Sequence, residues 1–178
     1  CIYAIPANAK RVLKVDCRNL TCQFIGPTFP MRQKWYGGLL AANGCVYGIP
    51  QQAEGVPKID PATDEVSVIC KGELPDTRKH MPPGGWMWHG GMLNKDCTAV
   101  YCFPNNSDHI LKVCTVTDTV KLLGGPDVLT SGRHRVPQDG RYKYLGGALD
   151  EQGNGYCFPC DAERVLFIDG NTDEVRCI

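Results

Sequence analysis

Residues 35–70 read WYGGLLAANGCVYGIPQQAEGVPKIDPATDEVSVIC, and this stretch decides the fold. It contains four short apolar runs, at 35–42, 45–50, 56–60 and 65–69, each closed by Gly, Pro, Asn or Asp. The runs are too short for helices and are rich in β-branched or aromatic residues, which is typical of strands. The stretch is therefore expected to form a four-stranded antiparallel meander.

The same unit returns twice more along the chain, at 88–123 and 144–178, and its last three strands open the chain at 1–25. A Gly pair marks each full unit, and a Tyr three residues before a Pro recurs four times, at Tyr3, Tyr47, Tyr101 and Tyr156. Four-stranded repeats of roughly 40 to 50 residues are typical of β-propellers.

The sequence thus predicts an all-β fold, a β-propeller of four-stranded antiparallel blades. About four blades are visible, at 1–26, 34–70, 87–124 and 143–178, and the first lacks its inner strand. They form a single propeller domain or part of a larger propeller. Because an open arc of blades leaves strand edges unpaired, we expect upstream sequence or another chain to complete it.

Composition excludes several classes of partner. The chain carries 19 Lys plus Arg and 19 Asp plus Glu, so its net charge is +0. Nucleic-acid binders usually carry a basic surplus, so no nucleic-acid partner is expected. No apolar run approaches the roughly 20 residues that a membrane-spanning helix needs, so the chain is not expected to span a membrane.

The 11 cysteines are odd in number and irregular in spacing, which favours plain thiols or local disulfides. Cys157 and Cys160 form a CxxC that ends a strand instead of opening a helix, so a redox site is not favoured. No metal and no cofactor is predicted, because no second Cys or His pair has zinc-site spacing. Two glycosylation patterns, at Asn19 and Asn105, keep a secreted or organellar lumen location open.

The stretch VYGIP…VPKIDPATDEVSVI resembles the YVTN and NHL class of propeller repeats, and the resemblance extends over most of each unit. Units with KW-x-GG and YGIP also resemble uncharacterised repeat proteins of unicellular algae. The resemblance implies a propeller and no particular activity, because propellers host hydrolases, lyases, binders and scaffolds.

The segments between blades become longer toward the C-terminus and are rich in Pro, Gly and charged residues. In a propeller these bridges share one face with the loops between the second and third strands. We expect that face to bind a protein partner, as an accessory or scaffold subunit of a larger assembly would. Its candidate residues are Arg32, Lys34, Arg78, Lys79, His80, Arg133, His134 and Arg135.

The alternative is a small-ligand or glycan binder that stacks its ligand on Trp35, Trp88 and Tyr144. Packing between blades is favoured over ligand stacking for these residues, because a repeated aromatic side chain suits a repeated wedge between blades. A propeller hydrolase or lyase comes third. The starts of the inner strands carry no carboxylates, and His89 stands there without a visible nucleophile, so no catalytic residue is assigned.

Overall fold

The computed structural model describes residues 1–74, 85–129 and 142–178. Its strands form four antiparallel sheets, here called blades 1 to 4, each built from consecutive strands. No described helix has the length and apolar character needed to cross a membrane.

Blade 1 has three strands, β1 (Ile2–Ala4), β2 (Val12–Asp16) and β3 (Thr21–Ile25). Blade 2 has four, β4 (Trp35–Leu40), β5 (Val46–Pro50), β6 (Val56–Asp60) and β7 (Glu65–Ile69). Blade 3 contains β8 (Trp88–Leu93), β9 (Ala99–Pro104), β10 (Ile110–Cys114) and β11 (Thr119–Leu123). Blade 4 contains β12 (Tyr144–Leu149), β13 (Gly155–Pro159), β14 (Leu166–Ile168) and β15 (Val175–Cys177).

The predicted meander and the missing strand of blade 1 are confirmed. The runs at 56–60 and 65–69 are strands over their whole length, while the first strand of blade 2 stops at Leu40, two residues early. One feature was not expected, a single helical turn, α1 (Pro126–Leu129), in the bridge before blade 4.

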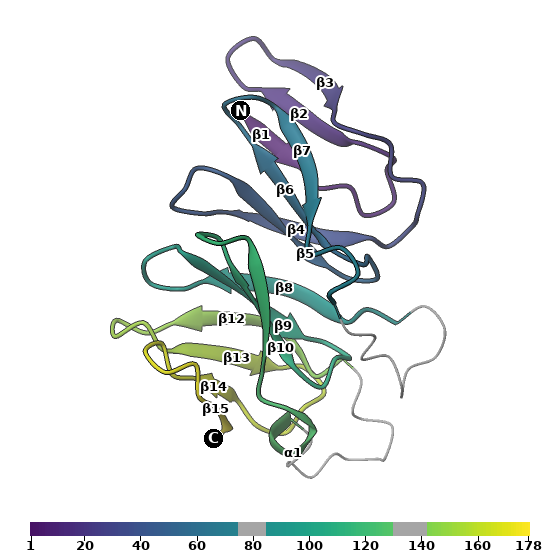
Figure 1. Ribbon diagram of the computed structural model, residues 1–178. Helices are drawn as coiled ribbons and strands as arrows, with labels where there is room; N and C mark the ends of the chain where they lie inside the picture. The colour runs from purple at the N-terminus through teal and green to yellow at the C-terminus, as the bar shows by residue number, and fades with distance from the viewer. Residues whose placement is uncertain (75–84, 130–141) are drawn as a thin grey trace.

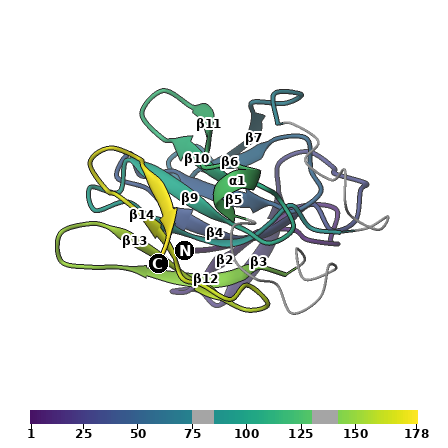
Figure 2. The same cartoon turned by 90° about the horizontal axis from the view of Figure 1, so that it is seen from below.

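The four blades stand side by side in an arc, with the N-terminus in blade 1 and the C-terminus in blade 4 (Figure 1). Figure 2 looks at this arc from the side of blade 4, so the sheets overlap along the line of sight. The inner strands β4, β8 and β12 contact one another in sequence, and each pairs on one edge only. Their other edges therefore line the inside of the arc.

Alternation along the strands builds the core between blades rather than within them. One face of β2 and β3 carries Val12 and Ile25, which pack on Ile59 and Val66 of blade 2. Equivalent apolar clusters fill the next two spaces between blades. Each blade is thus stabilised mainly by its neighbours.

A polar contact between neighbouring blades accompanies each apolar cluster. Between blades 1 and 2, the Tyr3 hydroxyl and the Lys14 ammonium both donate to Oδ1 of Asp64, at 2.9 and 2.7 Å. The hydrogen bond from Lys14, followed by that from Tyr3, lowers the pKa of the Asp64 carboxyl below its usual range. We call this arrangement the Tyr–Lys–Asp contact.

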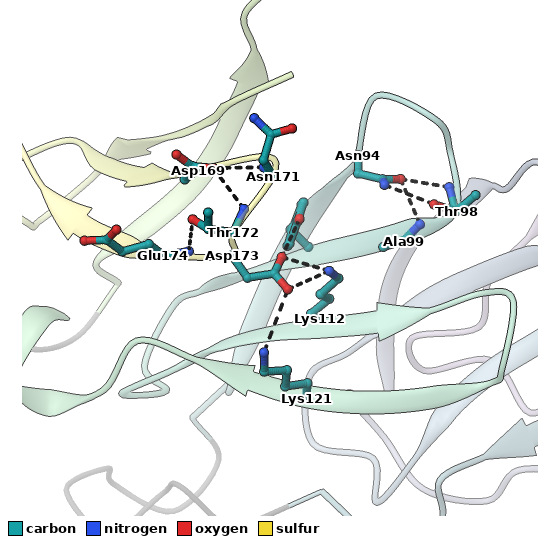
Figure 3. Close-up of polar contacts among 11 residues, drawn as sticks. Asn94, Thr98, Ala99, Lys112, Lys121, Asp169, Asn171, Thr172, Asp173 and Glu174 are labelled. Atoms are coloured by element: carbon teal, nitrogen blue, oxygen red, sulfur yellow. Dashed lines mark hydrogen bonds and ion pairs between the residues drawn. The ribbon is translucent and has the colours of Figure 1, made fainter. Parts of the chain in front are cut away.

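The Tyr–Lys–Asp contact recurs at the other two junctions. Between blades 2 and 3, Tyr47 and Lys58 donate to Asp118, at 2.7 and 2.5 Å. Between blades 3 and 4, Tyr101 and Lys112 donate to Asp173 at 2.9 and 2.8 Å, and Figure 3 shows Lys112 and Asp173 facing each other across this junction. In all three contacts the ammonium also lies within 5.9 Å of the Tyr ring centre.

In blades 2, 3 and 4, the turn between the last two strands presents the carboxylate. In blade 4, Oδ1 of Asp169 accepts hydrogen bonds from the backbone N–H groups of Asn171 and Thr172, as Figure 3 shows. This turn holds Asp173 at a φ of +62°, where Asp is better tolerated than most residues. Asp169 therefore has a structural role at this turn.

The Gly pairs let the blades approach closely. Ile5, Ile49 and Phe103 each pack against the second glycine of the next inner strand, which is Gly38, Gly91 or Gly147. A Cβ added at Gly147 would lie 2.8 Å from Cε1 of Phe103 and 2.6 Å from the Tyr156 carbonyl oxygen. Side chains larger than glycine do not fit there.

Gly147→Ala is therefore expected to lower the free energy of unfolding by about 1–3 kcal/mol, because the added methyl group overpacks the junction of blades 3 and 4. The neighbouring Gly146 is the matched control, since its Cβ would approach only Cδ2 of Phe158, at 4.0 Å. Urea denaturation of both variants measures the difference. Equal stability of the two variants would contradict the packing role of Gly147.

Candidate binding site on the inner strands

The three rings proposed for ligand stacking are buried between blades. Trp35 is 2% exposed, Trp88 0% and Tyr144 1%. The indole N–H of Trp35 donates to the Gly55 carbonyl at 2.9 Å, and that of Trp88 to the His109 carbonyl at 2.8 Å. These rings therefore pack between blades, and of the three only Trp35 also lines the cavity described below.

Lys34 lies in the interior rather than on the predicted interaction face. Its ammonium donates to the carbonyl oxygens of Met31, Ala9 and Ala7 at 2.7, 2.9 and 3.1 Å, and its burial lowers the pKa of the side chain. Lys34 thereby ties the bridge before β4 to blade 1. Arg32, two residues earlier, is exposed.

The remaining residues predicted for that face lie outside the described residues. They are Arg78, Lys79 and His80, in the segment 75–84, and Arg133, His134 and Arg135, in the segment 130–141. Their assignment to a protein-binding face stays a prediction.

Beside the buried rings, the next residue of each inner strand turns outward. The ring of Tyr36 stacks on His89 with centroids 3.8 Å apart, and Trp86 stacks on the same imidazole at 5.2 Å. Tyr142 meets Trp86 edge to face at 6.4 Å. Tyr36 is 48% exposed and Tyr142 46%. We call these four residues the aromatic shelf.

Backbone geometry places the shelf on the inner strands. Gly37 and Gly90 adopt φ values of +68° and +76°, and the pairing of β4 with β5 and of β8 with β9 shifts register at these points. Such bulges rotate the preceding side chain out of the regular alternation. Tyr36 and His89, which directly precede these glycines, consequently lie together across the junction of blades 2 and 3.

The shelf is uncharged near neutral pH. Burial lowers the pKa of His89 below its ordinary value, so the imidazole is neutral under these conditions. Nδ1 of His89 and Nε1 of Trp86 are buried and have no hydrogen-bond partner among the described residues. Both atoms are closed to solvent, so the part of the shelf that a ligand can reach is the flat surface of the rings.

The sequence prediction concerned the W-x-G-G motif, but the rings that it named are buried, and the exposed ring is the neighbouring Tyr36. Regular alternation predicts that one aromatic residue before the Gly pair faces inward and the next outward. The residues predicted to stack a ligand were the repeated Trp35, Trp88 and Tyr144, and no role was assigned to His89. Tyr36 could have been identified from its place in W-x-G-G. Trp86 and Tyr142 lie in the segments between blades, outside the repeated motifs, so the sequence does not mark them.

A second candidate site lies at the bridge before blade 2, which is the segment between β3 and β4. A cavity of about 380 Å³ is lined by Thr28, Phe29, Pro30, Met31, Lys34, Trp35, Ala53, Glu54, Gly55, Val68 and Lys71. It lies where the bridge meets the β5–β6 loop, on the face proposed for a protein partner. Met31 is 49% exposed at its rim.

The cysteines show no sign of redox chemistry in the described part of the chain. All 11 are free thiols, so of the two predicted states, plain thiols or local disulfides, the structure has plain thiols. Burial raises the pKa of the Cys157 thiol to about 12, which disfavours the thiolate that a CxxC redox site needs. Asn105 is 0% exposed and so is closed to glycosylation, while Asn19 is exposed.

Comparison with known proteins supports the fold alone. No protein-family model matches the chain, and no curated protein matches its sequence. Solved structures do match: virginiamycin B lyase from Staphylococcus aureus has a TM-score of 0.68 at 9% identity, covering 99% of this chain and 50% of that one. An auxiliary nutrient binding protein from Bacteroides ovatus has a TM-score of 0.61 at 14% identity, covering 99% and 45%.

A third match is an extracellular domain assigned to a one-component system of Bacteroides thetaiotaomicron, with a TM-score of 0.62 at 13% identity, covering 96% of this chain and 21% of that one. These neighbours are propeller-type proteins, so the predicted propeller fold is confirmed. The chain spans about half the length of the first matched structures.

The lowered pKa of His89 can be measured directly. We expect the imidazole protons of His89 to titrate by NMR with a midpoint below 6.5, because burial between Tyr36 and Trp86 disfavours the charged ring. Since the folded state then resists protonation, stability falls as the pH drops through 6.5. His89→Gln identifies the resonance, and a midpoint at or above 6.5 would contradict the buried, stacked imidazole.

Proposed function

We propose that the chain is a non-enzymatic binding module that holds a flat, uncharged ring on the aromatic shelf. The observation that carries this proposal is the stack of Tyr36, His89 and Trp86 with the exposed edge of Tyr142. Exposed, closely spaced rings are uncommon on a surface without a role in binding.

The chemistry of the shelf favours a neutral ligand such as a sugar ring or a small aromatic compound. Its rings offer large, rigid surfaces at low entropic cost, and the neutral imidazole does not attract an anion. Because Nδ1 of His89 and Nε1 of Trp86 are closed to solvent, stacking on the rings supplies the main contact with the ligand.

Binding rather than catalysis fits His89. A general base is usually oriented by a hydrogen bond to a third group, and Nδ1 of His89 has no such partner among the described residues. The neighbours include both a lyase and a nutrient binding protein, so the shared fold does not decide between catalysis and binding. We also propose that the four-stranded units are propeller repeats of the YVTN and NHL class, which they resemble. This resemblance implies no particular activity for the chain.

A second function, docking of a protein partner on the bridge face, is favoured by the cavity before blade 2. Its apolar wall includes Phe29 and Trp35, its rim carries the exposed Met31, and Arg32 is exposed nearby. Met and Arg are enriched at protein interfaces. An accessory or scaffold role would use this face.

Removal of one ring tests the shelf. Neutral oligosaccharides and uncharged aromatic compounds are titrated separately against the protein, with tryptophan fluorescence as the readout because Trp86 lies in the shelf. Whichever probe binds, Tyr36→Ala is expected to raise its dissociation constant by about 2- to 10-fold, which is the range for the loss of one aromatic contact.

Tyr36→Phe is the matched control, because it keeps the ring and should keep the affinity. Met31→Ala tests the bridge cavity in the same assay and should leave the shelf ligand unaffected. If no probe binds, or if Tyr36→Ala and Trp86→Ala both bind as the unchanged protein does, the shelf is not the site.

A further inference from the structure

One buried side chain joins the two shelf rings that lie between blades. Neither Trp86 nor Tyr142 belongs to a strand, so sheet hydrogen bonds hold neither of them. Asn106, in the loop between β9 and β10, is 6% exposed. Its Nδ2 donates to the Trp86 carbonyl oxygen at 2.8 Å, and its Oδ1 accepts the N–H of Tyr142 at 3.2 Å. The Asn106 side chain thus connects the segment before blade 3 with the segment before blade 4.

The partners of Asn106 require an amide. Its Nδ2 faces two acceptors, the Trp86 carbonyl oxygen and Oδ1 of Asn105, each at 2.8 Å. Its Oδ1 faces a donor, the Tyr142 N–H. Among side chains of this size, only an amide supplies both an acceptor and two donors. The three partners therefore fix both the residue type and the orientation of the amide.

The loop that carries Asn106 is itself fastened to both segments. The backbone N–H groups of Asn105, Asn106 and Ser107 all point at the Met87 carbonyl oxygen, at 3.1, 3.2 and 3.0 Å. The Asn105 carbonyl oxygen accepts the N–H of Lys143 at 2.8 Å. Asn105 and Ser107 are buried. The Asn106 amide is therefore held in place by the backbone around it.

The contact with the next segment recurs where no shelf ring is present. Asn8 follows the Pro of its Tyr-x-x-Pro motif at the same spacing as Asn106, and its Oδ1 accepts the N–H of Gln33 at 2.9 Å. Gln33 and Tyr142 both lie two residues before the buried ring of an inner strand. In blade 2, Gln52 holds the position of Asn106 and donates to the Gln33 side chain. Asn106 differs from both because the residues whose backbone it binds carry shelf rings.

We propose that Asn106 is the positioning residue of the aromatic shelf, binding the backbone of Trp86 and of Tyr142 so that their rings stand ready for a ligand. The two ring centroids are 6.4 Å apart with planes at 75°, and Trp86 also stacks on His89. A binding site needs supporting hydrogen bonds to hold such a geometry to within about 0.5 Å. The inference rests on the proposed binding of a ring to the shelf, and Asn106, being buried, acts through the rings.

Asn106→Ala tests the positioning without a ligand. With the amide removed, the Trp86 ring is held less firmly over His89, which becomes more accessible to water. The NMR titration midpoint of the His89 imidazole should therefore rise toward 6.5. The near-ultraviolet circular dichroism of the stacked rings should lose intensity in the same variant.

Asn94→Ala is the matched control. It removes three hydrogen bonds, to Thr98 and Ala99, at the other end of the inner strand of blade 3 (Figure 3). The control should lower the urea midpoint to a similar degree and leave both shelf signals unchanged. If Asn106→Ala leaves these signals unchanged, or if Asn94→Ala shifts them equally, the proposal is overturned.

A second variant covers the case in which Asn106→Ala does not fold. Asn106→Gln keeps an amide, and blade 2 already carries Gln52 at this position. Its longer side chain cannot keep both backbone contacts at their present lengths, so the same two shelf signals should shift. Unchanged signals in a folded Asn106→Gln variant would overturn the proposal.

Ligand binding is measured separately, by isothermal titration calorimetry with neutral oligosaccharides and with uncharged aromatic compounds. Asn106→Ala should raise the dissociation constant by about 2- to 10-fold, the range for the loss of one aromatic contact. In a background that carries Trp86→Ala and Tyr142→Ala it should have no further effect, because a positioning residue acts only through the rings that it holds. An undiminished effect in that background would overturn the proposal.

The two proposals fail in distinguishable ways. If no probe binds the unchanged protein while Asn106→Ala shifts the signals of His89 and Trp86, the binding function is wrong and the positioning is supported. If a probe binds through Tyr36 but Asn106→Ala changes neither the shelf signals nor the dissociation constant, the binding function stands and Asn106 is not its positioning residue.

Discussion

The structure depends on one repeated interaction, the Tyr–Lys–Asp contact between neighbouring blades. A sheet of four short strands cannot bury both of its faces alone, so each blade needs the next one. Apolar packing supplies most of the stabilisation but is not directional. The charged and hydrogen-bonded contact fixes how far each blade is rotated and shifted against its neighbour, since Tyr, Lys and Asp must all meet at one point.

This contact explains several features of the repeat. The Tyr in VYGIP and the Lys in VPKID lie opposite each other in the ladder, as the pairing of Tyr47 with Lys58 shows. The Asp at the end of the following turn is held toward the preceding blade by its positive φ. Residues that look like separate marks in the sequence therefore form a single group in space, shared between two blades.

Much of the fold could be predicted because strand period, turn residues and repeats are local signals. The four-stranded units and the missing inner strand of blade 1 were predicted from these signals. Of the aromatic shelf, only Tyr36 could have been predicted, from its place in W-x-G-G, because the bulges at Gly37 and Gly90 bring its ring onto His89. Trp86 and Tyr142 join it only through the three-dimensional course of the bridges. Lys34 was misplaced because its charge suggested the surface, whereas three carbonyl oxygens bind it inside.

A double-mutant cycle at Lys58 and Asp118 tests the central claim most directly. Both side chains are largely buried at the junction of blades 2 and 3, at 23% and 33% exposure, and their nearest atoms are 2.5 Å apart. Urea denaturation of Lys58→Met, Asp118→Asn and the double variant should give a coupling energy of about 1–3 kcal/mol, as for a charge-assisted hydrogen bond. A coupling energy within experimental error of zero would show that the blades are held in register by apolar packing alone.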